Sequence, residues 1–225
     1  MTSRKSDFPE KDQVKVLLWC ARHCCLCGKA CGVGIEVAHL DKGSNDIDEA
    51  IPLCFDCHAE IGHYTQDHPR GKKYSHRELK ARRNQVYEEY TSHLVPPLLY
   101  GLSQQGNKLP DVGFYIDHMG GPHPVKVRIT VTLSQGDRKH KPSTAGHYDG
   151  TYLWNLNPGF GVRGHFGIPA EILKHREVPL RAKIEATVID IYERSHVLLP
   201  MGFVIEQDRR GEWYLEPCME EIDKK

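Results

Sequence analysis

The sequence contains no long hydrophobic run and no excess of charge of either sign. No apolar stretch in its 225 residues approaches the ~20 residues that a membrane-spanning helix requires, and residues 1–7 are too polar to lead a secretory signal. We therefore expect a cytoplasmic protein that does not contact a membrane. Lysine plus arginine and aspartate plus glutamate each number 30, so the formal net charge is zero. The overall charge therefore gives no indication of nucleic-acid binding.

The sequence also lacks internal repeats and low-complexity tracts. Its 39% hydrophobic and 27% charged residues are typical of an ordinary soluble globular protein. A chain of this length can form one large domain or two modest ones, and each would be large enough to bury a core.

Eight cysteines are present, and in a reducing cytosol metal binding or free thiols explain them better than disulfides. Four of them form two Cys-x-x-Cys pairs, Cys24 with Cys27 and Cys54 with Cys57. Each pair can direct two sulfur atoms to one point, which suits a tetrahedral structural Zn²⁺. We interpret the others as small buried or reduced side chains, with Cys31 as the one alternative ligand: Cys20, Cys25, Cys31 and Cys218.

Two histidines accompany the cysteine pairs although a structural zinc site does not require them. His39 lies between the two pairs, and His58 directly follows Cys57. A zinc ion bound by the cysteines would therefore clamp a hairpin whose centre carries an imidazole. The arrangement indicates chemistry beyond a zinc knuckle.

At these residues the chain resembles the HNH endonuclease family, whose fold is also called the ββα-metal or His-Me finger, in its four-cysteine zinc version. The resemblance covers residues 9–95. It rests on the Cys24/Cys27 pair, Glu36-x-x-His39 at the end of a strand, a glycine-containing loop, and Leu53-Cys54-x-x-Cys57-His58 at the start of a helix. It implies a metal-dependent enzyme that hydrolyses phosphodiester bonds.

The resemblance also implies a role for three residues. His39 matches the general base that takes a proton from the attacking water, and His58 matches a ligand of the single catalytic Mg²⁺ or Mn²⁺ ion. Glu49 stands where the family has its middle asparagine, which braces the hairpin loop and orients the base. Asn45 is a nearby substitute for that asparagine.

The sequence departs from the family at Ala38, the residue before the base, where an aspartate or histidine often binds the metal. One protein ligand is therefore missing from the expected set, and we consider His63, Asp41 and Glu49 as replacements. An alternative for His58 is that it takes the place of Cys57 as a zinc ligand.

A basic segment follows the expected active-site helix. Such a cluster can displace counterions from a phosphate backbone, so we predict that it binds nucleic acid. The alternative is a solvated helix face. Between residues 70 and 83 one acid, Glu78, accompanies the basic residues Arg70, Lys72, Lys73, Arg77, Lys80, Arg82 and Arg83.

Two helices are expected in this half. The first covers residues 9–23, and its apolar residues fall on one face: Val14, Leu17, Leu18 and Ala21. The second begins at Ser75, because Ser75-x-x-Glu78 is a capping box. Its expected apolar seam consists of Leu79, Val86 and Tyr90, with Arg77, Lys80 and Arg83 facing elsewhere.

Composition places the domain boundary after the second helix. Pro96-Pro97 ends the helical segment, and residues 101–107 have the glycine and polar content of a linker. We therefore divide the chain into an HNH nuclease domain at residues 1–100, a linker at 101–110, and a β-rich accessory domain at 111–225.

After residue 110 apolar residues alternate with polar ones, as in half-buried strands. Strands are predicted at residues 125–133, 152–156, 180–188 and 197–205, with turns at 157–159 and 209–211. Short strands separated by such turns favour an antiparallel sandwich or a small barrel. The fold class is therefore α+β, and no chemistry is legible in the β-rich half.

These observations favour a metal-dependent HNH endonuclease that cuts nucleic acid, with double-stranded DNA as the favoured substrate and restriction or anti-phage defence as a role suggested by the architecture. A second reading is a catalytically inactive, zinc-stabilised nucleic-acid-binding or adaptor protein. A third places the function in the β-rich half, as a domain that binds a protein partner or ligand.

Overall fold

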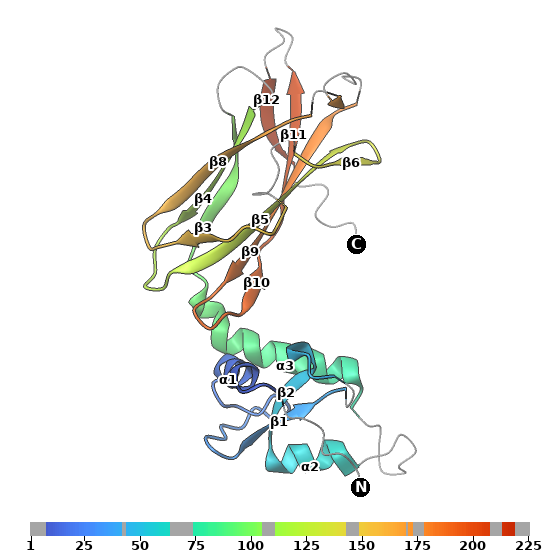
Figure 1. The fold of residues 1–225 in the computed structure, drawn as a ribbon, viewed down its shortest axis with the longest axis vertical. Helices are drawn as coiled ribbons and strands as arrows, with labels where there is room; N and C mark the ends of the chain where they lie inside the picture. Colours follow the sequence, from blue (N-terminus) through green and yellow to red (C-terminus); the bar gives the residue numbers. More distant parts are fainter. Residues whose placement is uncertain are drawn as a thin grey trace. The chain divides into compact units, whose positions relative to one another are not determined.

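The chain folds into two compact units, the first formed by residues 1–93 and 192–194 and the second by residues 94–191 and 195–225 (Figure 1). The computed structural model describes residues 8–41, 44–63, 74–104, 111–142, 149–169, 171–172, 178–207 and 213–218. None of the helices in these ranges is both long and apolar enough to cross a membrane.

In the first unit a two-stranded antiparallel sheet is followed directly by a helix. β1 (Ile35–His39) pairs with β2 (Ala50–Cys54), and a short 3-10 turn, η1 (Ile47–Glu49), leads into β2. α2 (Phe55–His63) begins at the residue after β2. The order strand, strand, helix is the one expected from the sequence.

Two further helices, α1 (Glu10–Trp19) and α3 (His76–Thr91), contact β2 and each other. The last helical turn, η2 (Ser92–Leu94), follows α3 directly. Buried apolar residues from α1, β2 and α3 form one core with the cysteines around the hairpin. α1 and α3 therefore pack against the hairpin through this core and hold it in place.

The first helix is shorter than predicted and buries a different face. Val14 and Leu18 are exposed, whereas Val16 and Cys20 are buried. The chain leaves the helix after Trp19, and Ala21 adopts a positive φ of 45°. The predicted face was wrong because the core packs against Val16 and Cys20, which lie one helical turn apart. The helix also ends before Ala21, so Ala21 cannot belong to its apolar face.

The start of α3 agrees with the predicted cap, since the Ser75 hydroxyl accepts a hydrogen bond from the Glu78 amide at 3.1 Å. The predicted seam holds at Leu79, which is buried, and in part at Val86, which is half-buried against the core, whereas Tyr90 stacks on His23. The buried residues of α3 recur every four positions and include a charged one: Leu79, Arg83, Tyr87 and Thr91.

Arg83 is 3% exposed and joins α3 to the residues that enter β2. Its Nη1 donates to the carbonyl oxygens of Asp48 and Ala50, at 2.6 and 3.1 Å, and its Nη2 donates to the Asp48 carboxylate at 2.9 Å. The guanidinium also lies over the ring of Tyr87, 5.6 Å from its centroid. One planar fork thus satisfies two backbone acceptors and one carboxylate.

Replacing Arg83 by methionine should lower the free energy of unfolding by on the order of 3 kcal/mol, because two backbone carbonyls lose a charged donor. Chemical denaturation of the full chain measures this loss. Arg82→Met is the matched control. Arg82 is exposed, pairs with Glu78 one turn earlier and lies over the Tyr74 ring at 6.0 Å, so its loss should change stability by no more than about 0.5 kcal/mol. Equal effects in the two variants would contradict a bracing role for Arg83.

Three residues from late in the chain complete the first unit. The backbone carbonyl of Tyr192 accepts a hydrogen bond from the Trp19 indole at 2.9 Å, and Glu193 pairs with Lys15 at 2.7 Å. Arg194 donates to the Thr91 hydroxyl and pairs with Glu88 at 2.9 Å. The segment 192–194 therefore binds α1 and α3 together.

The second unit consists of two antiparallel sheets. The smaller sheet contains, in spatial order, β3 (Leu98–Gln104), β4 (Asp111–His118) and β8 (Gly161–Gly167). The larger follows the order β12 (Trp213–Cys218), β11 (Met201–Gln207), β9 (Leu180–Ile189), β5 (Val125–Gln135) and β6 (Arg138–His140), with β10 (Ser195–Val197) on β9 and β7 (Trp154–Leu156) on β5.

Side chains from both sheets meet in one hydrophobic core. Phe114 of β4 and Ile129 of β5 are fully buried in it, and the ring of Phe114 lies 6.0 Å from that of Trp154 on β7. Along β5 and β9 every second residue is buried, as the alternation predicted. Two sheets that share one core form an antiparallel sandwich, one of the two predicted arrangements.

Three boundaries in this half differ from the prediction. Residues 101–104, predicted as linker, belong to β3. At Gly101 a Cβ would lie 3.0 Å from the hydroxyl of Tyr115, its cross-strand partner, so the glycine leaves room for that side chain. The predicted strand at 197–205 is two strands, β10 and β11, and the one at 152–156 is shortened to β7. A turn occupies residues 158–159 as expected, and residues 209–211 lie outside the described ranges.

Candidate functional site

The two predicted cysteine pairs come together in the first unit. Cys24 and Cys27 lie in the turn that follows α1, where the Gly28 amide donates to the Cys24 carbonyl at 2.9 Å. Cys54 ends β2 and Cys57 lies in the first turn of α2. All four Sγ atoms lie within 4.8 Å of one another. The β1–β2 hairpin and α2 are therefore joined at one point to the turn that follows α1.

This cluster could hold a metal ion such as zinc. The Cys27 and Cys54 sulfurs are 3.9 Å apart. A tetrahedral zinc with Zn–S bonds of ~2.3 Å requires sulfurs about 3.8 Å apart, so the separation fits. The Cys57 amide also donates to the Cys54 sulfur at 3.5 Å. Four sulfur ligands leave no open position on the metal, so such a site would be structural.

The backbone around the cluster prepares at least one thiol for metal binding. Burial alone would raise the pKa of the Cys24 thiol, but amides of Cys27 and Cys54 donate to its sulfur and lower its pKa to about 7. Burial and the neighbouring sulfurs of Cys54 and Cys27 raise the pKa of Cys57. A cation is what allows several neighbouring thiolates to coexist.

The remaining cysteines lie outside the cluster. Cys20 and Cys25 are both buried in the core of the first unit. The thiol of Cys31 donates to the carbonyl of Lys29 at 3.0 Å, so Cys31 is not among the four grouped ligands. Cys218 is in β12 of the second unit.

His39 lies at the end of β1 and is held on two sides. Its Nε2 lies 3.1 Å from the Asn45 Oδ1, and its ring stacks on Phe8 with centroids 4.0 Å apart. Phe8 is 3% exposed, so the stack fixes the imidazole plane against the protein core. A single aromatic residue near the start of the chain carries no sequence pattern that links it to His39, and sequence reasoning missed it.

His58 lies in α2 and is bound by a carboxylate from β1. Its Nδ1 is 2.5 Å from the Glu36 Oε2. Glu36 and Ala38 share one face of β1, because side chains in a strand alternate. The carboxylate that binds His58 thus comes from the same face of β1 as Ala38, the position where a metal ligand was expected. The sequence motif contained Glu36, but it gave no reason to assign the residue a role.

Asn45 and Glu49, the two residues considered for the loop, make different contacts. Asn45 contacts His39, while Glu49 ties the loop to α3 through the Lys80 Nζ at 2.6 Å and the His76 Nε2 at 2.7 Å. Hydrogen bonds from Lys80 and His76 lower the pKa of Glu49. Glu49 is therefore engaged as a brace, and its carboxylate points to α3.

The structure does not complete a ligand set around His58. Within the described ranges, the four cysteines are the one group of three or more metal-binding side chains that come together. His63 ends α2, but its side chain lies outside what the structure describes. Asp41 is exposed beyond the end of β1.

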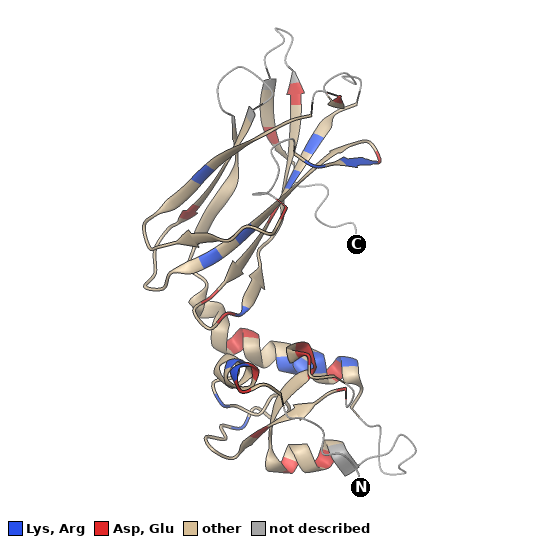
Figure 2. Cartoon of the chain, in the orientation of Figure 1, with Lys and Arg blue, Asp and Glu red and all other residues tan. Residues whose placement is uncertain are grey.

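The predicted basic segment divides in two. Residues 70, 72 and 73 lie outside the described ranges. On α3, Arg77 and Arg82 are exposed, whereas Lys80 pairs with Asp48 and Glu49 and Arg83 is buried. Hydrogen bonds to Asp48 and Glu49 raise the pKa of Lys80. Basic and acidic segments lie side by side along α3 in Figure 2. The described part of the segment therefore presents two exposed cations, while the other two brace the loop.

Comparison with known proteins gives no relative that identifies the chain. No family model matches it, and no curated protein matches it. A crystal structure of a protein from Archaeoglobus fulgidus is 9% identical, with a TM-score of 0.28, over 54% of this chain and 92% of that chain. The thioester domain of the Enterococcus faecium TIE86 protein is 10% identical, with a TM-score of 0.17, over 94% of this chain and 68% of that chain. Likenesses this weak carry no functional argument.

Proposed function

We propose that the first unit is a metal-dependent endonuclease of the HNH type that hydrolyses phosphodiester bonds in DNA. The observation that carries the proposal is the hairpin-and-helix unit, with His39 at the end of β1 and His58 in α2, joined at the cysteine cluster. Hydrolysis of a phosphodiester requires an activated water, neutralisation of the charge on the phosphate oxygens, and help for the leaving oxygen.

His39 supplies the general base. When its Nε2–H donates to Asn45, the ring Nδ1 carries the lone pair, and this nitrogen takes the proton from the attacking water. The stack on Phe8 prevents the ring from rotating away from that position. The contacts to Asn45 and Phe8 thus hold the ring in one orientation, as a base needs.

His58 supplies the ligand for a divalent cation, with its Nε2 as the free nitrogen because Nδ1 is bound to Glu36. A bound Mg²⁺ or Mn²⁺ would stabilise charge on the phosphate and on the leaving oxygen. Glu36 acts here as a positioning residue. A carboxylate on the second nitrogen of a metal-binding histidine fixes its orientation and makes it a stronger ligand.

Replacing Glu36 by glutamine should raise the Mg²⁺ or Mn²⁺ concentration needed for half-maximal cleavage by about 10–100-fold. A metal titration of plasmid nicking measures the shift. Cleavage should recover at high metal concentration, which a merely misfolded variant would not do. Glu60→Gln on the exposed face of α2 is the control and should leave the titration unchanged. An unshifted curve for Glu36→Gln would remove Glu36 from the site.

DNA is proposed as the substrate because most proteins that the first unit resembles cut DNA. Within the predicted basic segment, Arg77 and Arg82 on α3 are the described residues that are exposed and could contact a phosphate backbone. A nuclease unit joined to a separate β-sandwich would suit a restriction or anti-phage defence effector, with the sandwich as its sensing or targeting part.

The deciding experiment is a nicking assay on supercoiled plasmid with Mg²⁺, with Mn²⁺, and with EDTA. The proposal expects nicked plasmid only when a divalent cation is added. If neither cation supports nicking by the zinc-loaded full chain, the assignment as a nuclease is wrong.

Ala38 favours a second candidate, a zinc-stabilised nucleic-acid-binding or adaptor protein without catalysis. Its side chain offers no ligand atom, and around His58 no group of three metal-binding side chains forms among the residues that the structure describes. The same preparation would then retain plasmid in a gel-shift experiment without nicking it.

A further inference from the structure

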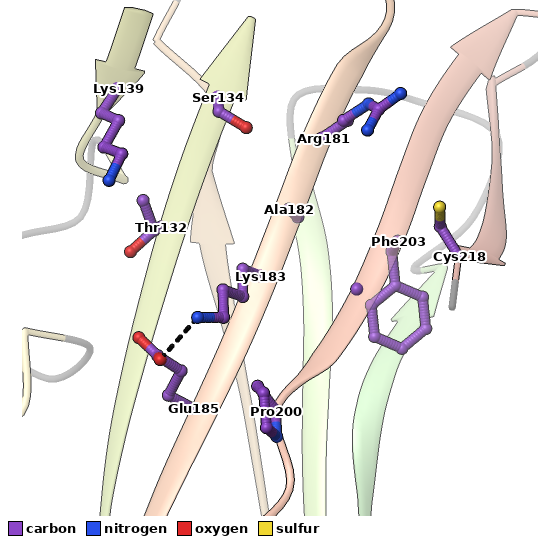
Figure 3. Close-up of a pocket in the computed structure, with 11 residues that line it drawn as sticks. Thr132, Ser134, Lys139, Arg181, Ala182, Lys183, Glu185, Pro200, Phe203 and Cys218 are labelled. Atoms are coloured by element: carbon purple, nitrogen blue, oxygen red, sulfur yellow. Dashed lines mark hydrogen bonds and ion pairs between the residues drawn. The ribbon is translucent and has the colours of Figure 1, made fainter. Parts of the chain in front are cut away.

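The larger sheet of the second unit carries a hollow of about 340 Å³ on the face turned away from the core (Figure 3). The outward residues of β5 and β9 line it, because the inward residues of the same strands are buried in the core. Volumes of this size lie at the lower end of the range for small-molecule sites.

Strand register explains which side chains meet in the hollow. Ser134 on β5 is paired with both Arg181 on β9 and Lys139 on β6, and cross-strand partners project to the same side of a sheet. One step along the strands, Lys183 is paired with both Thr132 and Gly202. The two rows are separated by two residues, or roughly 7 Å along the strand.

Gly202 has no side chain, and this leaves space in the row formed by Thr132, Lys183 and Gly202. Gly202 lies between Lys183 and Cys218 in the register, and it leaves empty the place where another residue would project. A Cβ at Gly202 would lie 2.8 Å from the backbone oxygen of Cys218, so the close approach of β11 and β12 requires glycine. The space above Gly202 is thus a consequence of how these two strands pair.

The side chains around this space are suited to an anion. Three cations line it, and one acid, Glu185, is paired with Lys183 at 2.7 Å. Lys183 and Glu185 are both about half exposed, so their ion pair is weak and can be exchanged for a stronger one. Two hydroxyl groups can donate beside the cations. The lining cations and hydroxyls are Lys139, Arg181, Lys183, Thr132 and Ser134.

We propose that this hollow binds a phosphate-bearing small molecule of nucleotide size. Arg181 and Lys183 on one strand, with Lys139 across from Ser134, surround the space with positive charge from more than one direction. An arginine fork beside lysines and hydroxyls matches the oxygens of a phosphate group. The hollow is limited in volume, which favours a compact ligand over a polymer laid along the sheet. The proposal stands independently of the nuclease activity.

Isothermal titration of the zinc-loaded full chain at low salt tests this, with inorganic pyrophosphate and AMP as probes. We expect at least one of them to bind with a dissociation constant in the millimolar range or tighter. The double variant Lys139→Gln with Lys183→Gln should weaken binding by at least about tenfold, since charge-assisted contacts are lost. The double variant Lys126→Gln with Arg128→Gln is the matched control, because it removes the same charge from the same face of the larger sheet, on β5 outside the hollow.

Alkylation of Cys218 gives a second, local readout. Its thiol lines the hollow, so a bound probe should slow its modification by iodoacetamide, followed by mass spectrometry of the peptide that contains it. Three results would overturn the proposal: no binding of either probe, equal weakening in both double variants, or binding of a 12-nucleotide single strand alone. The last would assign the face to a polynucleotide instead.

Discussion

The full chain is expected to retain one zinc ion after dialysis against zinc-free buffer, and the variant Cys54→Ser is expected to lose it. Cys54 ends β2, and the cluster joins that strand to α2 and to the turn after α1. Structural zinc contributes on the order of 10 kcal/mol to the folding of small zinc-stabilised units, so the first unit of the variant should unfold. Metal analysis and the loss of cooperative unfolding measure the two effects.

Cys31→Ser is the control for this experiment. Cys31 lies close in sequence to the first pair but outside the cluster, where its thiol donates to the Lys29 carbonyl. The variant should keep its zinc and its stability. A wild-type chain that is well folded and free of metal would show that the cysteines serve another purpose.

Replacing His39 by alanine is expected to lower the rate of plasmid cleavage by about 10²–10⁴, the usual contribution of a general base. The alanine leaves the cysteine cluster and the Glu36–His58 pair in place. Zinc content and the metal concentration for half-maximal cleavage should therefore stay as in the wild type. A lower rate with an unchanged metal titration indicates a general base, whereas loss of a metal ligand would shift the titration to higher metal concentration.

His93→Ala provides the matched control, because His93 is an exposed histidine in the 3-10 turn η2 that ends the same unit. Its removal should leave the rate unchanged. If His39→Ala cleaves plasmid at the wild-type rate, the general base must be sought elsewhere in the chain.

The elements that depend on local pattern were predictable from the sequence. The Cys-x-x-Cys spacing predicted that the four cysteines come together. The alternation of apolar and polar residues predicted β5 and β9 almost to the residue. These predictions succeed because ligand spacing and strand periodicity are set by a few neighbouring residues.

Contacts between segments distant in sequence were not predictable. Arg83 was predicted to face away from the apolar seam and to bind a phosphate backbone, yet its acceptors are Asp48 in η1 and Ala50 in β2. The pairing of Glu36 with His58, and the stack of Phe8 on His39, likewise depend on how separate elements pack. Gly101 was interpreted as linker because its cross-strand partner Tyr115 was unknown.

The return of residues 192–194 to the first unit bears on how the protein can be dissected. A fragment that ends at residue 93 has the cysteines, His39 and His58, but it leaves the Trp19 indole without its carbonyl acceptor and the Thr91 hydroxyl without Arg194. Such a fragment therefore lacks contacts that α1 and α3 make in the intact chain. A loss of activity on truncation would therefore reflect missing supports on α1 and α3, and point variants in the intact chain are the sounder way to separate the two units.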